Sequence, residues 1–162
     1  MPAVSMPRAL RTPDDLRRAS VEIWYEYSMF CQLAKGLASG VLGEGPIRNA
    51  ALEAFLLHTR ALTEFFYQAS PRSDDIVAQD FMSVSVTWMG ICPPISPALE
   101  KLRHRAGKHL AHLTYDRLEV KPETKPWPFL EILSGVAAPL QVFLLHASKE
   151  VLADDWFDKL QV

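Results

Sequence analysis

Basic residues and histidines are concentrated in residues 102–117, which read LRHRAGKHLAHLTYDR. Arginine carries a planar fork of donors that fits a phosphate group, and it stays charged at neutral pH. Histidine titrates near neutrality, so it can take a proton from a hydroxyl or return one. In RNA the neighbouring 2′-hydroxyl supplies an internal nucleophile. The stretch therefore indicates RNA binding or cleavage without a metal or another cofactor.

Four candidate residues of this stretch share one face of a predicted helix; they are Arg105, Lys108, His109 and His112. At about 100° per residue, Arg105 and His112 are seven positions apart and fall within roughly 20° of each other. Lys108 and His109 lie between or beside them. An apolar stripe adjoins this face, centred about 100° away; it consists of Leu99, Leu102, Ala106, Leu110 and Leu113. One flank of the helix should be buried, and the adjoining flank should carry positive charge and imidazole.

An arginine followed after four to six residues by a histidine, on a late helix of a small helical protein, resembles the motif of the HEPN superfamily. Arg105 and His112 have this spacing, and the sequence Ala-His-Leu at 111–113 is similar to the end of the family motif. Arg103 and His109 also fit by count, but they point about 120° apart. We therefore prefer the pair Arg105 and His112.

The resemblance implies a function and an assembly. Many HEPN proteins are metal-independent ribonucleases, often toxins or defence effectors, whose paired helices form the site in a dimer. It implies that Arg105 holds the phosphate and His112 serves in acid–base chemistry, with Lys108 and His109 binding the substrate. The expected partners are RNA, a second copy bound through the third and fourth helices, and a partner antitoxin protein. Ala106 stands where the family often has a polar residue, and inactive HEPN-like domains act as dimerisation or interaction modules, so a catalytically silent module is one alternative.

A metal site is the other alternative. His58, His112 and His146 fall on three different predicted helices, and bundle proteins gather a metal in their core in this way. Such a site would resemble the DinB-type metal-binding bundles. The spacing contains no HExxH pair on one helix.

Composition indicates an ordinary soluble domain. The chain has 162 residues, a formal net charge of −2, 49% hydrophobic and 22% charged residues, which argues against a disordered chain and a globally basic nucleic-acid binder. Cys31 and Cys92 are expected to be free thiols in a reducing cytoplasm. The apolar run 129–147 contains Glu131, Gln141 and Pro139, and it is expected to be a buried helix, with no membrane contact.

Helix start signals divide the chain. Residues 1–11 are expected to form a flexible arm, and residues 12–162 a single helical-bundle domain. Thr12 followed by Pro13 and two aspartates predicts a helix to about Lys35. A second helix is expected from Pro46 to about Gln68.

The second half of the chain adds two further long helices. Ser96 and Pro97 open a third helix, and a fourth should begin near Trp127 and run past His146 with a bend at Pro139. In the connector, residues 73–75 could cap a short helix through Phe81, and residues 88–94 should dock on the bundle. The predicted fold is therefore all-α, an up-down four-helix bundle with an extra short helix between helices 2 and 3.

Overall fold

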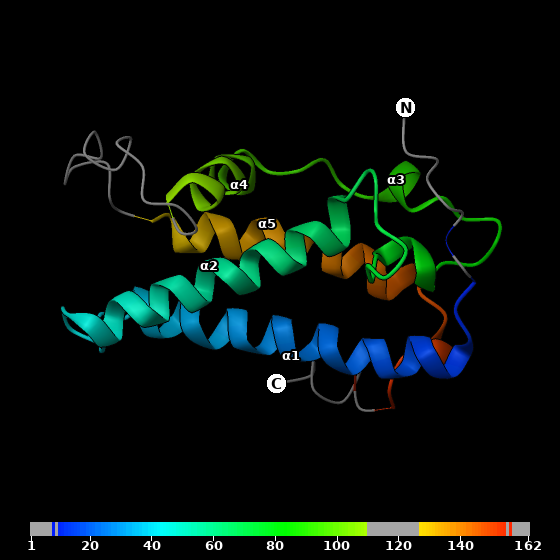
Figure 1. The fold of residues 1–162 in the computed structure, drawn as a ribbon, viewed down its shortest axis with the longest axis horizontal. Coiled ribbons are helices and arrows are strands. Elements are labelled where there is room, and N and C mark those ends of the chain that lie inside the picture. The colour runs from blue at the N-terminus through cyan, green and yellow to red at the C-terminus, as the bar shows by residue number, and fades with distance from the viewer. Residues whose placement is uncertain (1–7, 9, 110–126, 155, 157–162) are drawn as a thin grey trace.

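The computed structural model describes residues 8, 10–109, 127–154 and 156, and for residues 104–109 it describes the backbone alone (Figure 1). The described residues form helices and connections but no strand, which confirms the all-α prediction for this part of the chain. The elements are α1 (Pro13–Ala38), α2 (Pro46–Tyr67), the 3₁₀-helix η1 (Ala78–Phe81), α3 (Trp88–Ile91), α4 (Pro97–His109), α5 (Phe129–His146) and the 3₁₀-helix η4 (Lys149–Val151).

Helix α1 begins where the sequence predicts. The Thr12 hydroxyl accepts the backbone N–H of Asp15 at 3.1 Å, and the Asp15 carboxylate accepts the N–H of Thr12 at 3.3 Å. This reciprocal capping box satisfies two of the amide groups that a helix start leaves unpaired. One face of the helix is then buried against α2 and α5; it includes Leu16, Ile23, Phe30, Ala34 and Leu37.

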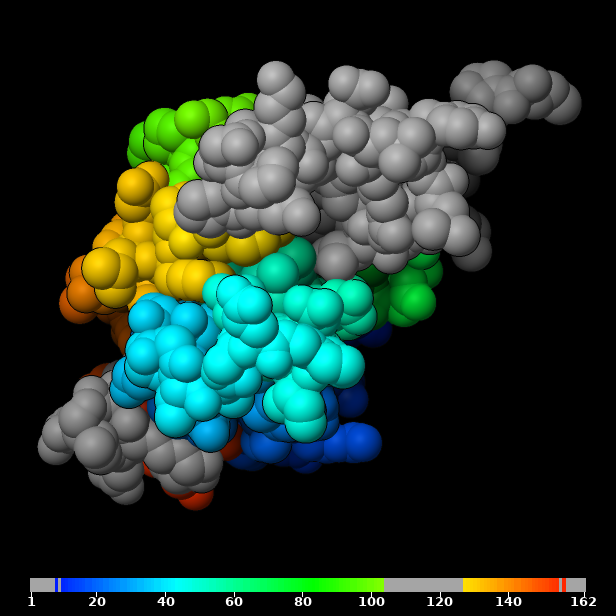
Figure 2. Space-filling model, turned by 90° about the vertical axis from the view of Figure 1, so that its left-hand side faces the viewer, coloured from blue at the N-terminus to red at the C-terminus, as the bar shows by residue number. Residues whose placement is uncertain are grey.

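A glycine-rich connection joins α1 to α2. Gly45 has a φ of 115° and Pro46 follows at the first helical position, so the backbone turns where a side chain would be strained and restarts where proline is favourable. The Phe30 and Phe55 rings then stack across the two helices with centroids 5.4 Å apart. Figure 2 views this end of the molecule, with the connection in cyan and the beginning of α5 in yellow.

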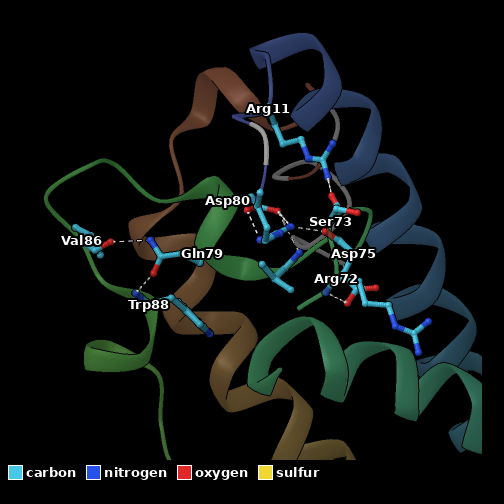
Figure 3. Close-up of polar contacts among 10 residues, drawn as sticks. Arg11, Arg72, Ser73, Asp75, Gln79, Asp80, Val86 and Trp88 are labelled. Atoms are coloured by element: carbon cyan, nitrogen blue, oxygen red, sulfur yellow. Dashed lines mark hydrogen bonds and ion pairs between the residues drawn. The ribbon is translucent and has the colours of Figure 1, made fainter. Parts of the chain in front are cut away.

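The connector between α2 and α4 is held by polar contacts rather than by a long helix (Figure 3). Trp88 is 2% exposed and its indole N–H donates to the Phe66 carbonyl at 2.7 Å. The Gln79 amide donates to the Val86 carbonyl at 3.0 Å and accepts the Trp88 backbone N–H at 2.6 Å. The docking predicted for residues 88–94 is therefore confirmed at Trp88.

Arginines near the N-terminus explain why the short helix predicted from residue 73 forms only as η1. Arg8 makes an ion pair with Asp80 at 2.9 Å and donates to the Asp75 carbonyl, and Arg11 donates to the Ser73 carbonyl (Figure 3). The Asp75 carboxylate also accepts the Arg72 backbone N–H at 2.7 Å. These contacts hold residues 72–75 in a turn, because they engage carbonyl groups that a longer helix would use.

Helix α4 packs against α2 and α5, and α5 packs against α1 and α2 (Figure 1). The contact between α4 and α5 requires Gly135, because a Cβ atom there would lie 2.4 Å from the Ser96 hydroxyl and 3.1 Å from Leu99. Pro139 lies inside α5, as predicted, but α5 ends at His146 rather than continuing past it.

The segment after α5 returns to α1. Trp156 is fully buried, and its indole N–H donates to the Ser20 carbonyl at 3.0 Å. The Ser20 hydroxyl accepts the Ala153 backbone N–H at 2.9 Å.

No other described element packs on one face of α5, which we call its uncovered face. The helix has 18 residues with a mean hydropathy of 1.6, and 33% of it is buried. Leu130 is 73% exposed and Leu145 is 80% exposed. By length and composition, α5 is the one helix of the described residues that could cross a membrane, but core helices of soluble proteins share these properties.

Candidate nucleic-acid interface

Helix α4 carries the first part of the basic stretch. The Ser96 hydroxyl accepts the Leu99 backbone N–H at 3.3 Å, so serine caps the helix as the sequence predicts. Leu99 and Leu102 are 1% and 2% exposed, while Arg103 is exposed. The predicted apolar stripe is therefore confirmed at Leu99 and Leu102, which contact the rest of the protein, and the arginine beside them faces solvent.

The structure describes the predicted site residues to different extents. Arg105, Lys108 and His109 lie on the α4 backbone, but their side chains lie outside the described part of the structure. His112 lies outside the described residues altogether. The pairing of Arg105 with His112 therefore stays a prediction. Helix geometry places Arg105 about 60° around α4 from the buried Leu102, on the flank of the buried face.

A cavity lies between α2 and α4, on the Arg103 side of α4. It has a volume of about 280 Å³. Its lining consists of Arg60, Thr63, Glu64, Tyr67 and Gln68 from α2 with Leu102 and Arg103 from α4. Among the described lining residues there are thus two arginines from two helices and one carboxylate, that of Glu64.

The Arg60 side chain is held by its neighbour. Its Nε atom lies 2.8 Å from the Glu64 Oε1 atom, one helical turn along α2, and both side chains are about half exposed. The Thr63 hydroxyl donates to the Thr59 carbonyl at 2.7 Å, so towards a ligand it can only accept. Hydrogen-bond donors to an anion in this cavity therefore come mainly from Arg60 and Arg103.

Tyr67 forms a wall of the cavity rather than a proton-transfer group. Its hydroxyl oxygen is buried beside the Cys92 thiol, and burial raises the pKa of Tyr67 well above its ordinary value. Burial also raises the pKa of Cys92 to about 11. Both groups therefore stay protonated at neutral pH, and the thiol is a poor nucleophile. The cavity can bind and position a ligand, but these two groups supply no general base.

A second cavity lies on the opposite side of α2, towards α1, with a volume of about 430 Å³. Its charged lining residues are the acids Glu22, Glu26, Glu64 and Asp75 and the bases Arg60 and Arg72. Acids outnumber bases here, so this cavity is unfavourable for a phosphate. Arg60 and Glu64 border both cavities and form the ridge between them.

The histidines of the alternative metal site are engaged in other contacts. The Nδ1 atom of His58 lies 2.7 Å from the Glu26 carboxylate. The Tyr25 ring packs edge-on against the imidazole, with the two ring centroids 5.8 Å apart. The Nδ1 atom of His146 lies 2.9 Å from the Val142 carbonyl. Metal-bound imidazoles also hold such partners at the second nitrogen, and His112 lies outside the described residues. Within the described ranges no three metal-ligating side chains gather, so the three-histidine site stays a prediction.

Sequence reasoning missed Arg60 and Tyr67 as site residues. Both lie on α2, more than thirty residues before Arg103, and neither belongs to a motif. The clue was the arginine–glutamate spacing at Arg60 and Glu64, which also describes an ordinary solvated helix face. Comparison with known protein families, curated proteins and solved structures found no match to this chain.

Proposed function

We propose that this protein binds RNA and cleaves it without a metal, as the HEPN resemblance implies. The observation that supports the proposal is the docking of α4. Leu99 and Leu102 are buried while Arg103 is exposed at the rim of a cavity. The same helix carries Arg105, Lys108 and His109 further along its backbone, and the exposed arginine just before them supports the approach of a long anion to it.

The proposed chemistry uses one arginine and one histidine. Arg105 holds a backbone phosphate, and His112 takes the proton of the adjacent 2′-hydroxyl. The 2′-oxygen then attacks phosphorus, the bond to the 5′-oxygen breaks, and a protonated imidazole returns a proton to that leaving oxygen. The products are a 2′,3′-cyclic phosphate and a 5′-hydroxyl end. Lys108 and His109 bind neighbouring parts of the RNA.

The proposal includes an up-down bundle of α1, α2, α4 and α5 that forms a homodimer in the cytoplasm. Support for the dimer comes from the uncovered face of α5. Its uncharged residues are spaced by three or four positions; they are Leu130, Ser134, Ala138, Gln141 and Leu145, and the exposed Glu131 lies at the border of this face. This face is self-complementary about a two-fold axis between residues 137 and 138: antiparallel pairing sets Leu130 against the partner's Leu145, and Ser134 against the partner's Gln141.

A dimer would bring two copies of the basic helix onto one assembly, which supplies a second imidazole for the leaving group. A toxin or defence role, with an antitoxin protein as partner, belongs to the same proposal. It follows from the resemblance alone.

The test is cleavage of a labelled single-stranded RNA in the presence of EDTA. Arg105→Ala and His112→Ala should each abolish cleavage while the folding transition is retained, and Arg72→Ala, beside the acidic cavity, should cleave like the wild type. Cleavage that survives both substitutions contradicts the assigned roles. Loss of cleavage on chelation, with stoichiometric metal in the purified protein, favours the three-histidine site. RNA that stays intact with a stable dimer in solution favours the silent interaction module.

A further inference from the structure

We propose that the cavity between α2 and α4 binds one backbone phosphate of the RNA, held by Arg60 and Arg103. This inference rests on the proposed function, because RNA is the ligand that it places there. It adds two binding residues that lie outside the basic motif, one of them on a different helix.

The guanidinium groups of Arg60 and Arg103 both have nitrogen atoms available to bind a phosphate. Arg60 uses Nε for its contact with Glu64, and within the described part of the chain its two terminal nitrogens make no hydrogen bond. Arg103 is exposed and, among the described residues, makes no hydrogen bond or ion pair. A guanidinium with an open edge binds phosphate oxygens through two parallel hydrogen bonds.

The lining of the cavity suits a phosphate together with the groups that flank it. The volume of the cavity is about 280 Å³, at the lower end of the range of roughly 300–1,000 Å³ typical of ligand pockets. The walls fit the parts that flank a phosphate: Leu102 and the Tyr67 ring are apolar, and the Gln68 amide can donate or accept. A nucleotide within a strand presents these same surfaces.

The charge around α2 directs an anion to this side of the helix. In the α2–α4 cavity two arginines meet one carboxylate, and that carboxylate is already paired with Arg60. In the α1–α2 cavity the carboxylates outnumber the arginines. A phosphate that approaches the ridge of Arg60 and Glu64 is therefore attracted on the α4 side and repelled on the α1 side.

The path of the strand follows from the geometry of α4. Relative to Leu102, Arg103 is turned by about 100° in one direction and Arg105 by about 60° in the other. A strand bound at both positions therefore crosses the outward face of α4. The exposed Glu100 and Lys101 both lie on that face and their charges offset each other, so the attraction along the crossing comes from the arginines at its two ends.

The experiment measures binding of a short fluorescein-labelled single-stranded RNA by anisotropy, in full-length protein carrying His112→Ala so that the RNA stays intact. Titrations between roughly 50 and 200 mM salt give the affinity and its salt dependence. Arg103→Ala should weaken binding about tenfold, the loss of one charged hydrogen-bond contact. It should also reduce the slope of log K against log salt by about 0.7. Arg60→Ala should act in the same direction, and Arg72→Ala is the charge-matched control.

Two results overturn the inference in distinguishable ways. In the first, the parent protein binds RNA, and the Arg60 and Arg103 variants bind it as tightly as the Arg72 control while their thermal transitions show that they are folded. The phosphate subsite is then wrong and the proposed function stands. If the parent protein binds no RNA at low salt, the proposed function fails, and the subsite fails with it.

Discussion

Arg60 and Glu64 form an ion pair at 2.8 Å on the ridge that separates an acidic cavity from a basic one. The pair is about half exposed, so it contributes little to stability. Its effect on ligand binding is larger, because Glu64 is the one carboxylate lining the cavity that we assign to phosphate.

Glu64→Gln should therefore tighten RNA binding. The substitution removes the negative charge and frees Arg60 to face the phosphate, and we expect a gain of roughly threefold to tenfold at low salt that shrinks as salt rises. Anisotropy titrations measure it. Glu53→Gln, an exposed acid elsewhere on α2, is the control. A purely structural role for Glu64 predicts unchanged or weaker binding.

Substitution on the uncovered face of α5 should separate the proposed dimer. Leu130→Glu or Leu145→Glu places a charge in an apolar interface, and two-fold symmetry places that charge in the interface once from each protomer. Light scattering should show a monomer for either variant and a dimer for the wild type. Leu57→Glu, at a residue 61% exposed on α2, should remain dimeric. A wild-type monomer at micromolar concentration would contradict the assembly.

Gly135→Ala should destabilise the fold by roughly 1–3 kcal/mol, the usual cost of overpacking. The added methyl group would lie 2.4 Å from the Ser96 hydroxyl, so α4 and α5 must separate or the serine must turn. Urea unfolding measures the change. Gly90→Ala meets nothing within 4 Å and should be nearly neutral. Equal midpoints for the two variants would show that the α4–α5 contact is looser than described.

Ser20→Ala should loosen the return of the chain to α1. The Ser20 hydroxyl accepts the Ala153 backbone N–H, and its loss leaves that amide without a partner, at a cost of about 1–2 kcal/mol. Ser28→Ala, which removes a partly exposed hydroxyl bonded to Gln32, should cost less. Hydrogen exchange at Ala153 provides a local readout: slow exchange retained in Ser20→Ala would contradict the assigned bond.

Stability should fall at alkaline pH. Burial raises the pKa of Cys92 from 9.0 to about 11 and that of Tyr27 from 10.0 to about 12. The folded protein therefore keeps protons that the unfolded chain has already lost. Stability is full below about pH 9 and declines above it. Urea midpoints measured from neutral pH to about pH 11 should show this decline, and Cys92→Ser should make it shallower. A Cys92→Ser profile parallel to the wild type would contradict the raised pKa of the half-buried Cys92 thiol.

Local signals in the sequence predicted the helix starts. Thr12 with Asp15, Pro46, and Ser96 with Pro97 each open a helix in the structure, because capping depends on neighbours a few residues away. The apolar stripe of α4 was confirmed at Leu99 and Leu102 for the same reason, since helical periodicity decides which side chains are buried.

Contacts between residues far apart in the chain could not be predicted from the sequence. His58 was predicted as a ligand of the alternative metal site, but its pairing with Glu26, 32 residues earlier, depends on how α1 and α2 cross. The cavity residues Arg60 and Arg103 come together only because α4 packs beside α2. The short helix expected from residue 73 was shortened to Ala78–Phe81 by Arg8 and Arg11, whose reach across more than sixty residues has no local signature.

The most direct test of the central claim is analysis of the ends produced from a single-stranded RNA incubated with the protein in EDTA, beside the same oligonucleotide with 2′-deoxyribose throughout. Attack by the 2′-hydroxyl predicts 2′,3′-cyclic phosphate ends from the RNA and an intact deoxy strand. Cleavage of both strands, or an RNA that stays intact under these conditions, would contradict the account.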